Sequence, residues 1–220
     1  MIQPFAEEVY VKKIITPWLK WPASFLSYIF HPIFLPIYAV AFLLYVHPSY
    51  FSGFSASGKL QTLLITTINL VAFPLLTILL LKALGFVDSI FLRTRRDRII
   101  PYMACGIFFF WAYTVFKKEG SYPPIMASFI LGVFLAASAG LLANIYFKIS
   151  MHALGVGGLL GLFFVLAYQN SMLMTWAVAS ALVIAGLVCT ARLIVSNHTQ
   201  KDIYTGLALG ILSQIVAAAV

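Results

Sequence analysis

The last polar stretch of the chain contains three residues whose types and spacing suit phosphate chemistry: Arg192, His198 and Asp202. His198 and Asp202 are four residues apart, so at a helix start they face the same side and can hydrogen-bond. A carboxylate on one imidazole nitrogen fixes the tautomer and raises the basicity of the other nitrogen, which makes the ring a nucleophile or a base. Arg192 precedes the pair, and its guanidinium can hold an anion against His198 through two hydrogen bonds.

Two earlier polar stretches supply further candidates. Ser150 and His152 stand at a predicted helix start, where free backbone N–H groups attract anions, and His152 can act there as a general acid. The first stretch, residues 93–101, carries four arginines within six residues. Its candidates for phosphate binding are Arg93, Arg96 and Arg98.

Each stretch also has a structural interpretation. The residues around His198 fit a helix N-cap with flanking charges, and a lone histidine at a helix start, such as His152, is more often structural. The arginines of residues 93–98 fit a cytoplasmic loop that binds lipid headgroups. The glycines at 155, 157, 158 and 161 lie in an apolar segment, so they predict close helix packing rather than a phosphate loop.

The elements that must position these residues are membrane helices. Of the 220 residues, 62% are hydrophobic and 9% are charged, and the mean hydropathy is +1.00. A soluble domain carries about 25% charged residues, so this chain is expected to be solvated by lipid. The net charge of +8 then indicates contacts with lipid phosphates and membrane topology rather than nucleic-acid binding.

Hydropathy predicts an all-α, polytopic transmembrane bundle of about six or seven helices. We expect residues 1–22 to form an interfacial segment, with Trp18 and Trp21 as anchors, and residues 23–220 to form a single membrane-embedded domain. The first predicted span contains Pro32 and Pro36 and the second contains Pro74, so both are expected to kink. The predicted spans are 24–46, 61–84, 100–117, 124–146, 152–169, 172–194 and 202–219.

An even number of spans separates the three polar stretches, so they are expected on one side of the membrane. That side also carries most of the lysines and arginines, which the positive-inside rule assigns to the cytoplasm. We therefore predict an integral protein of the cell (inner) membrane with its site on the cytoplasmic side. The two cysteines, Cys105 and Cys189, lie in apolar segments and predict neither a disulfide nor a metal site.

In this order and on a shared face, the three stretches resemble the motifs of the type-2 phosphatidic acid phosphatase superfamily, which contains lipid phosphate phosphatases and relatives of the vanadium haloperoxidases. The family's third motif is Ser-Arg, five residues, His, three residues, Asp, and a Gly four residues further. The chain matches it at Arg192, His198, Asp202 and Gly206 and has Ala191 in place of the Ser. The resemblance covers residues 93–210 or so.

The other two motifs are more divergent. The family's second motif, Pro-Ser-Gly-His, is Ile149-Ser150-Met151-His152 here. In the first motif, a Lys, six residues, Arg and Pro, alignment on Pro101 places Arg93 at the Lys and Ile100 at the Arg. Either Arg96 or Arg98 is then expected to supply the missing charge.

The resemblance implies a metal-independent hydrolase, without cofactor, that acts on a lipid phosphate or a polyprenyl (di)phosphate. By the same resemblance, His198 attacks phosphorus, Asp202 orients it, and His152 protonates the leaving oxygen. The phosphoryl oxygens are bound by Ser150 and by the arginines at 93, 96 or 98, and 192. The alternatives are a non-enzymatic relative that binds or moves anionic lipids, a transporter, and a prenyltransferase, which the absence of paired Asp-rich motifs disfavours.

Overall fold

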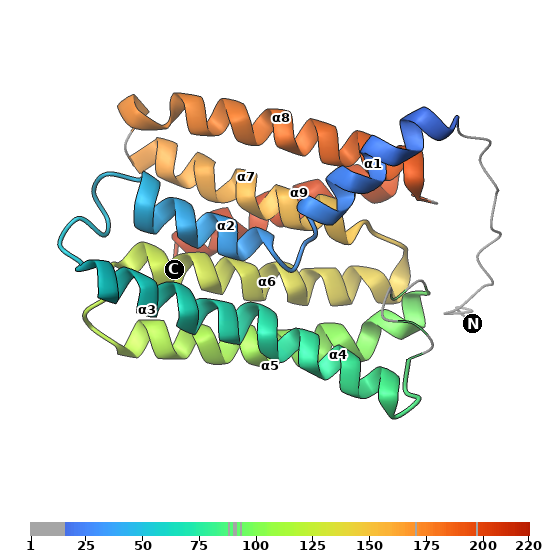
Figure 1. The fold of residues 1–220 in the computed structure, drawn as a ribbon, viewed down its shortest axis with the longest axis horizontal. Coiled ribbons are helices and arrows are strands. Elements are labelled where there is room, and N and C mark those ends of the chain that lie inside the picture. The colour runs from blue at the N-terminus through green and yellow to red at the C-terminus, as the bar shows by residue number, and fades with distance from the viewer. Residues whose placement is uncertain (1–15, 88, 90–91, 93, 170, 197) are drawn as a thin grey trace.

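The computed structural model describes residues 16–87, 89, 92, 94–169, 171–196 and 198–220, and the secondary structure within them is entirely helical. The predicted all-α bundle is confirmed (Figure 1). In chain order the helices are α1 (Pro17–Ile29), α2 (Leu35–Ala41) with a π turn (Phe42–Val46), α3 (Ala56–Thr67) with a π turn (Ile68–Ala72), α4 (Phe73–Ala83), α5 (Arg95–Lys118), α6 (Pro124–Tyr146), α7 (Met151–Gln169), α8 (Ser171–Val195) and α9 (Gln200–Ala218).

Five helical segments in the described chain are long and apolar enough to cross a membrane, which makes this a membrane protein. They agree with the predicted second to sixth spans to within a few residues. The predicted seventh span is α9, which has 19 residues but does not belong to this set. The five segments are Ala56–Ala83, Arg95–Lys118, Pro124–Tyr146, Met151–Gln169 and Met174–Val195.

The expected single first span, residues 24–46, is wrong. The chain forms two separate helices here, α1 and α2, and α2 with its π turn extends only over Leu35–Val46. The break lies at His31 and Pro32, because proline disfavours helical geometry in the preceding residue and has no N–H to donate. The predicted kink is therefore a complete interruption, and it brings His31 into the bundle.

The second predicted span continues through its proline. Helices α3 and α4 join through the π turn Ile68–Ala72, immediately before Pro74. A proline leaves the carbonyl four residues earlier without its helical partner, and a π turn is one way in which a helix absorbs that loss.

Glycines bring α7 and α9 into close contact, as their apolar setting predicts. A Cβ added at Gly157 or Gly161 of α7 would overlap the backbone of Leu207 or Ile211 in α9. The same holds in the other direction for Gly210, whose added Cβ would overlap the backbone of α7. Small residues at such contacts let helix backbones approach closely, so the middle of α9 is fixed against α7.

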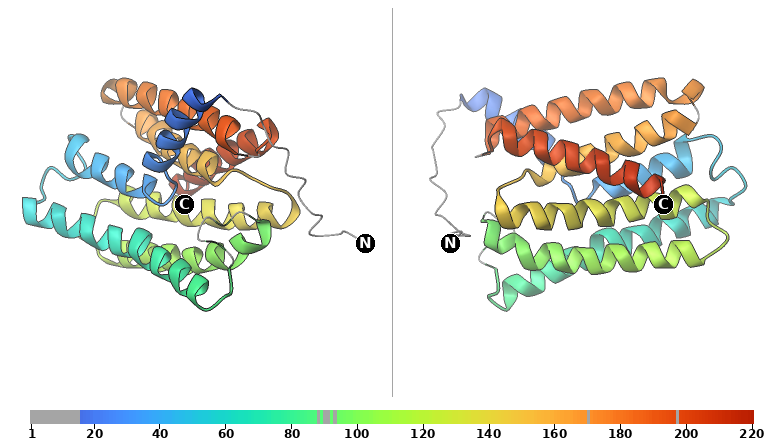
Figure 2. Two further views of the ribbon diagram at one scale, coloured as in Figure 1. Left: turned by 45° about the vertical axis from the view of Figure 1, so that its right-hand side comes forward. Right: turned by 180° about the vertical axis from the view of Figure 1, so that it is seen from behind.

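The three polar stretches lie at one end of the bundle. In Figure 1 the α4–α5, α6–α7 and α8–α9 connections are all at the right-hand end, and the reversed view in Figure 2 agrees. Helix α1 begins at the same end. Most of the predicted interfacial segment, residues 1–15, and Arg93 lie outside the described residues. Within the described part of that segment, Trp18 and Trp21 of α1 are each 73% exposed.

Candidate functional site

A cavity of about 660 Å³ is lined by residues from all three polar stretches. Helices and loops from across the chain line it, including α1, the α1–α2 turn, the starts of α5 and α7, and the α8–α9 connection. Among the described residues, its ionisable lining includes four cations and three histidines but no aspartate or glutamate. These residues are Lys20, His31, Arg98, Lys148, His152, Arg192 and His198.

Helix α9 begins with a capping box that fixes Asp202. The Thr199 hydroxyl accepts a hydrogen bond from the Asp202 N–H at 3.2 Å, and Asp202 Oδ2 accepts one from the Thr199 N–H at 2.8 Å. The same Oδ2 lies 3.4 Å from His198 Nδ1. That nitrogen is buried and does not meet hydrogen-bond geometry with any described partner, so the contact is electrostatic in this state. Because Nδ1 faces the carboxylate, Nε2 is the nitrogen left for chemistry.

His198 is held in its neutral form. Burial is the main cause that lowers its pKa from 6.5 to about 4. Three cations act in the same direction, Arg98, Arg192 and Lys148, and the Asp202 carboxylate opposes them. A neutral imidazole keeps a lone pair at neutral pH, which is the form that a nucleophile requires.

The guanidinium of Arg192 has no hydrogen-bond or ion-pair partner among the described residues. It lies in the last turn of α8, where a cation is favoured by the helix dipole. Its buried Nε has no hydrogen-bond partner among the described residues, and no ion pair in that part of the chain involves it. A charge toward the interior of a membrane protein is costly unless it is paired. Arg192 therefore lines the cavity as a guanidinium without a counter-ion in the part of the chain that the structure describes.

Of the arginines in the first polar stretch, the structure places Arg98 in the cavity wall. Arg98 is 8% exposed; its Nε donates to the Leu92 carbonyl at 2.9 Å and its Nη1 to the Ile149 carbonyl at 3.2 Å. These bonds tie the start of α5 to the loop before α7. Arg96 is exposed and does not line the cavity, and Arg93 lies outside the described residues.

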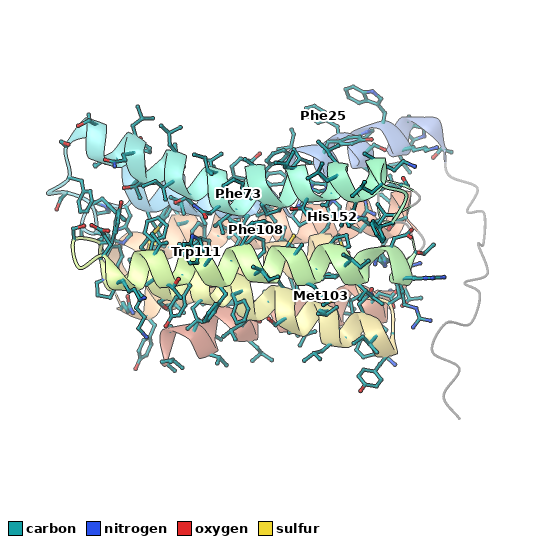
Figure 3. The ribbon with its side chains drawn as sticks, turned by 90° about the horizontal axis from the view of Figure 1, so that it is seen from below. Phe25, Phe73, Met103, Phe108, Trp111 and His152 are labelled. Carbon is teal, nitrogen blue, oxygen red and sulfur yellow. The ribbon has the colours of Figure 1, made fainter. Side chains whose placement is uncertain are left out.

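Ser150 and His152 lie at the start of α7 but have different surroundings. Ser150 is fully buried, and its hydroxyl accepts a hydrogen bond from the Ala153 N–H at 3.3 Å. Its own N–H donates to the Asp202 carbonyl at 3.2 Å. Ser150 therefore caps α7 and joins it to α9, and it does not line the cavity. His152 does line it, and Figure 3 shows its side chain inside the bundle.

The first helices contribute residues that the motifs do not include. His152 Nε2 lies 3.1 Å from the Ser27 carbonyl of α1. The rings of His31 and His152 are in edge-to-face contact, with centroids 5.3 Å apart. Burial, followed by the charge of Arg192, lowers the pKa of His31 from 6.5. Lys20 of α1 also lines the cavity. One signal could have revealed His31: it is the only strongly polar ionisable residue within the predicted span 24–46.

The cavity continues from this charged end into the apolar interior. One face of α5 lines it from Arg98 to Phe109. At a rise of 1.5 Å per residue, these positions extend over about 16 Å, roughly one leaflet of a 30 Å hydrocarbon core. A polar end beside an apolar interior of this depth suits an anion that carries a hydrocarbon tail.

The described residues contain no group of three or more His, Cys, Asp or Glu side chains that could hold a metal ion. What they bring together is a cavity wall of cationic side chains that includes the buried imidazole of His198. The chain matches no protein-family model, no curated protein and no solved structure.

Proposed function

We propose that this protein is a membrane phosphatase that hydrolyses a lipid phosphate or a polyprenyl (di)phosphate, as a divergent member of the type-2 phosphatidic acid phosphatase superfamily. One observation carries the proposal. The cavity has cationic walls without a described carboxylate, and Arg192 has no counter-ion among the described residues. An anion is the ligand that such a site lacks, and a phosphoryl group can accept two hydrogen bonds from a guanidinium.

The neutral imidazole supports hydrolysis over binding alone. His198 Nε2 attacks phosphorus, the bond to the leaving oxygen breaks, and a phosphohistidine forms. Arg192 and Arg98 stabilise the charge that develops on the phosphoryl oxygens. Asp202, 3.4 Å from Nδ1, stabilises the positive charge that His198 gains. Water then attacks the phosphohistidine and releases phosphate.

The tail of the substrate lies in the apolar part of the cavity, along the face of α5 from Arg98 to Phe109. Only the headgroup has to reach the charged end. That end also has the excess of lysines and arginines, which by the positive-inside rule favours the cytoplasmic side of the cell membrane.

A phosphate-release screen tests the proposal. Purified protein is incubated in EDTA with phosphatidate, phosphatidylglycerophosphate, and polyprenyl phosphates and diphosphates. We expect release from at least one of them, and its loss in His198→Ala. The control is His47→Gln, which alters a histidine at the other end of the bundle. Release that persists undiminished in His198→Ala would remove His198 as the nucleophile.

One observation favours a second candidate, a protein that binds or moves anionic lipids. His198 Nδ1 makes no hydrogen bond to any described residue, and the nearby oxygen of Asp202 already accepts one from Thr199. The imidazole is thus less fully activated than a hydrogen-bonded pair. Retained binding to anionic liposomes without turnover of any substrate in the screen would support this candidate over the phosphatase.

A further inference from the structure

His31 lies in the wall of the cavity although it belongs to none of the three polar stretches. It follows α1, and the turn at Pro32 directs the chain back toward α7. Its ring contacts the ring of His152 edge to face, at an interplanar angle of 83°. The charge of Arg192 acts on it as well. His31 therefore shares its surroundings with the groups that we assign to phosphate binding.

The backbone determines which nitrogen of His31 carries the proton. The Ile33 N–H donates to His31 Nδ1 at 3.4 Å. In the neutral ring this places the proton on Nε2. No described residue accepts a hydrogen bond from Nε2. His31 is thus an N–H donor that remains available to a ligand.

His152 is engaged differently. Its Nε2 lies 3.1 Å from the Ser27 carbonyl, and because a carbonyl only accepts, Nε2 is the donor. This bond holds α1 against the start of α7. To donate Nε2–H to a substrate, His152 would have to release the Ser27 carbonyl. The Nε2–H of His31, in contrast, has no described acceptor to release, and only its Nδ1 holds a longer bond, from the Ile33 N–H.

We propose that His31, rather than His152, protonates the leaving oxygen, and that His152 is a positioning residue that holds His31 and α1 in place. The inference rests on the proposed phosphatase function. It assigns a catalytic residue to the α1–α2 turn, outside the segment that carries the three motifs. Two observations support this assignment: the rings of His31 and His152 are in contact, and His152 is bonded to the Ser27 carbonyl.

The proton balance is complete with the groups at hand. An incoming phosphate brings negative charge that opposes Arg192, so the imidazolium form of His31 is favoured when substrate is bound. His31 then gains a proton on Nδ1, which replaces the 3.4 Å hydrogen bond from the Ile33 N–H. As the His198 nitrogen bonds to phosphorus, the bond from phosphorus to the leaving oxygen breaks and Nε2 of His31 gives that oxygen its proton, leaving the other proton on Nδ1. In the second step, water attacks phosphorus, the bond to His198 breaks, and the free Nε2 of His31 takes the proton of the water.

Leaving-group dependence distinguishes an acid from a residue that only supports the structure. The substrates are a long-chain alkyl phosphate, whose alkoxide needs a proton to leave, and 4-nitrophenyl phosphate, whose phenolate does not. We expect His31→Gln to lose about 10²–10⁴-fold on the alkyl phosphate, the usual contribution of general acid catalysis, and less than about tenfold on the aryl phosphate. His152→Gln should lose similar factors on both substrates, because it displaces the site as a whole.

Three results would overturn the inference. Equal losses on both substrates in His31→Gln would show a structural role, and an unchanged rate on both would show no role. A loss confined to the alkyl phosphate in His152→Gln would make His152 the acid.

A wild-type protein that turns over neither substrate would instead refute the proposed function, and binding then tests His31 separately. Titration with inorganic phosphate should show weaker binding in His31→Gln, by about tenfold for one lost charge-assisted hydrogen bond. His47→Gln, the other-end control, should bind as the wild type does. Equal phosphate affinity in His31→Gln and the wild type would remove His31 from the anion site.

Discussion

Replacing Arg192 with methionine should separate stability from function. Methionine has a similar length and is apolar, so Arg192→Met removes the charge and largely retains the volume. If Arg192 is kept for a phosphate, the variant loses phosphate release yet folds at least as well as the wild type. If Arg192 instead supports the structure, the variant loses stability.

The magnitudes follow from where Arg192 lies. A charge at the centre of a membrane helix costs about 2.5–3.5 kcal/mol, and less near an end. Arg192 is in the last turn of α8, where the helix dipole returns about 0.3–1 kcal/mol. Because its Nε has no described partner, little else is lost, and we expect a net gain of about 1–2 kcal/mol. Loss of one donor to a phosphoryl oxygen should lower kcat about 10²–10³-fold.

Two assays on the same preparation measure these effects: thermal unfolding in detergent, and phosphate release from the best substrate. The matched control is Arg96→Met, which removes an exposed arginine outside the cavity and should change neither result. A marked fall in the unfolding temperature of Arg192→Met, of the size expected for a broken buried ion pair at about 3–5 kcal/mol, would refute the reasoning. So would an unchanged rate of release.

Three further predictions concern Asp202, His198 and Gly157. Asp202→Asn should lower phosphate release because it removes the negative charge beside His198. Thr199→Ala removes only the helix cap, so it should cost about 0.5–2 kcal/mol of stability with little change in the rate of release. Equal rates of release in the two variants would exclude a role for the carboxylate. Attack on phosphorus needs neutral His198, and burial lowers the pKa of His198 to about 4. The rate limited by this group should therefore stay level as the pH falls to about 4 and then drop tenfold per pH unit. A pH profile that falls near 6.5 would contradict the burial of His198. Gly157→Ala should destabilise the protein because its Cβ would overlap the Leu207 carbonyl. Gly186 has open space around it, so Gly186→Ala should leave the free energy of unfolding unchanged or raise it by up to about 1 kcal/mol. Thermal unfolding of both variants checks this.

Hydropathy alone predicts most of the helices because a membrane span imposes length and apolarity on every segment. Pro124–Tyr146 agrees with the expected residues 124–146. The first span could not be predicted in the same way. Hydropathy averaged over about 20 residues does not reveal that one helix ends before His31 and Pro32 and another begins after them. Residues 24–46 are mostly apolar, but the chain divides them between two helices.

For the site, too, the sequence predicts what depends on local spacing but not what depends on tertiary packing. The spacing from Arg192 to Asp202 is a local property, and the structure places Arg192 and His198 in one cavity, with Asp202 directly behind His198. The choice between Arg96 and Arg98 depends on which face of α5 turns inward, and Arg98 is the one in the wall. Ser150 has the right spacing too, but its hydroxyl caps α7.

Trapping of the phosphoenzyme is the most direct test of His198 as the nucleophile. Wild-type protein is mixed with an excess of its best substrate and quenched in alkali, which preserves phosphohistidine, and its peptides are analysed by mass spectrometry. We expect a phosphoryl group on His198, absent from His198→Ala and still formed in His152→Gln. A phosphoryl group on another residue, or phosphate release without any phosphorylated form of His198, would contradict this expectation.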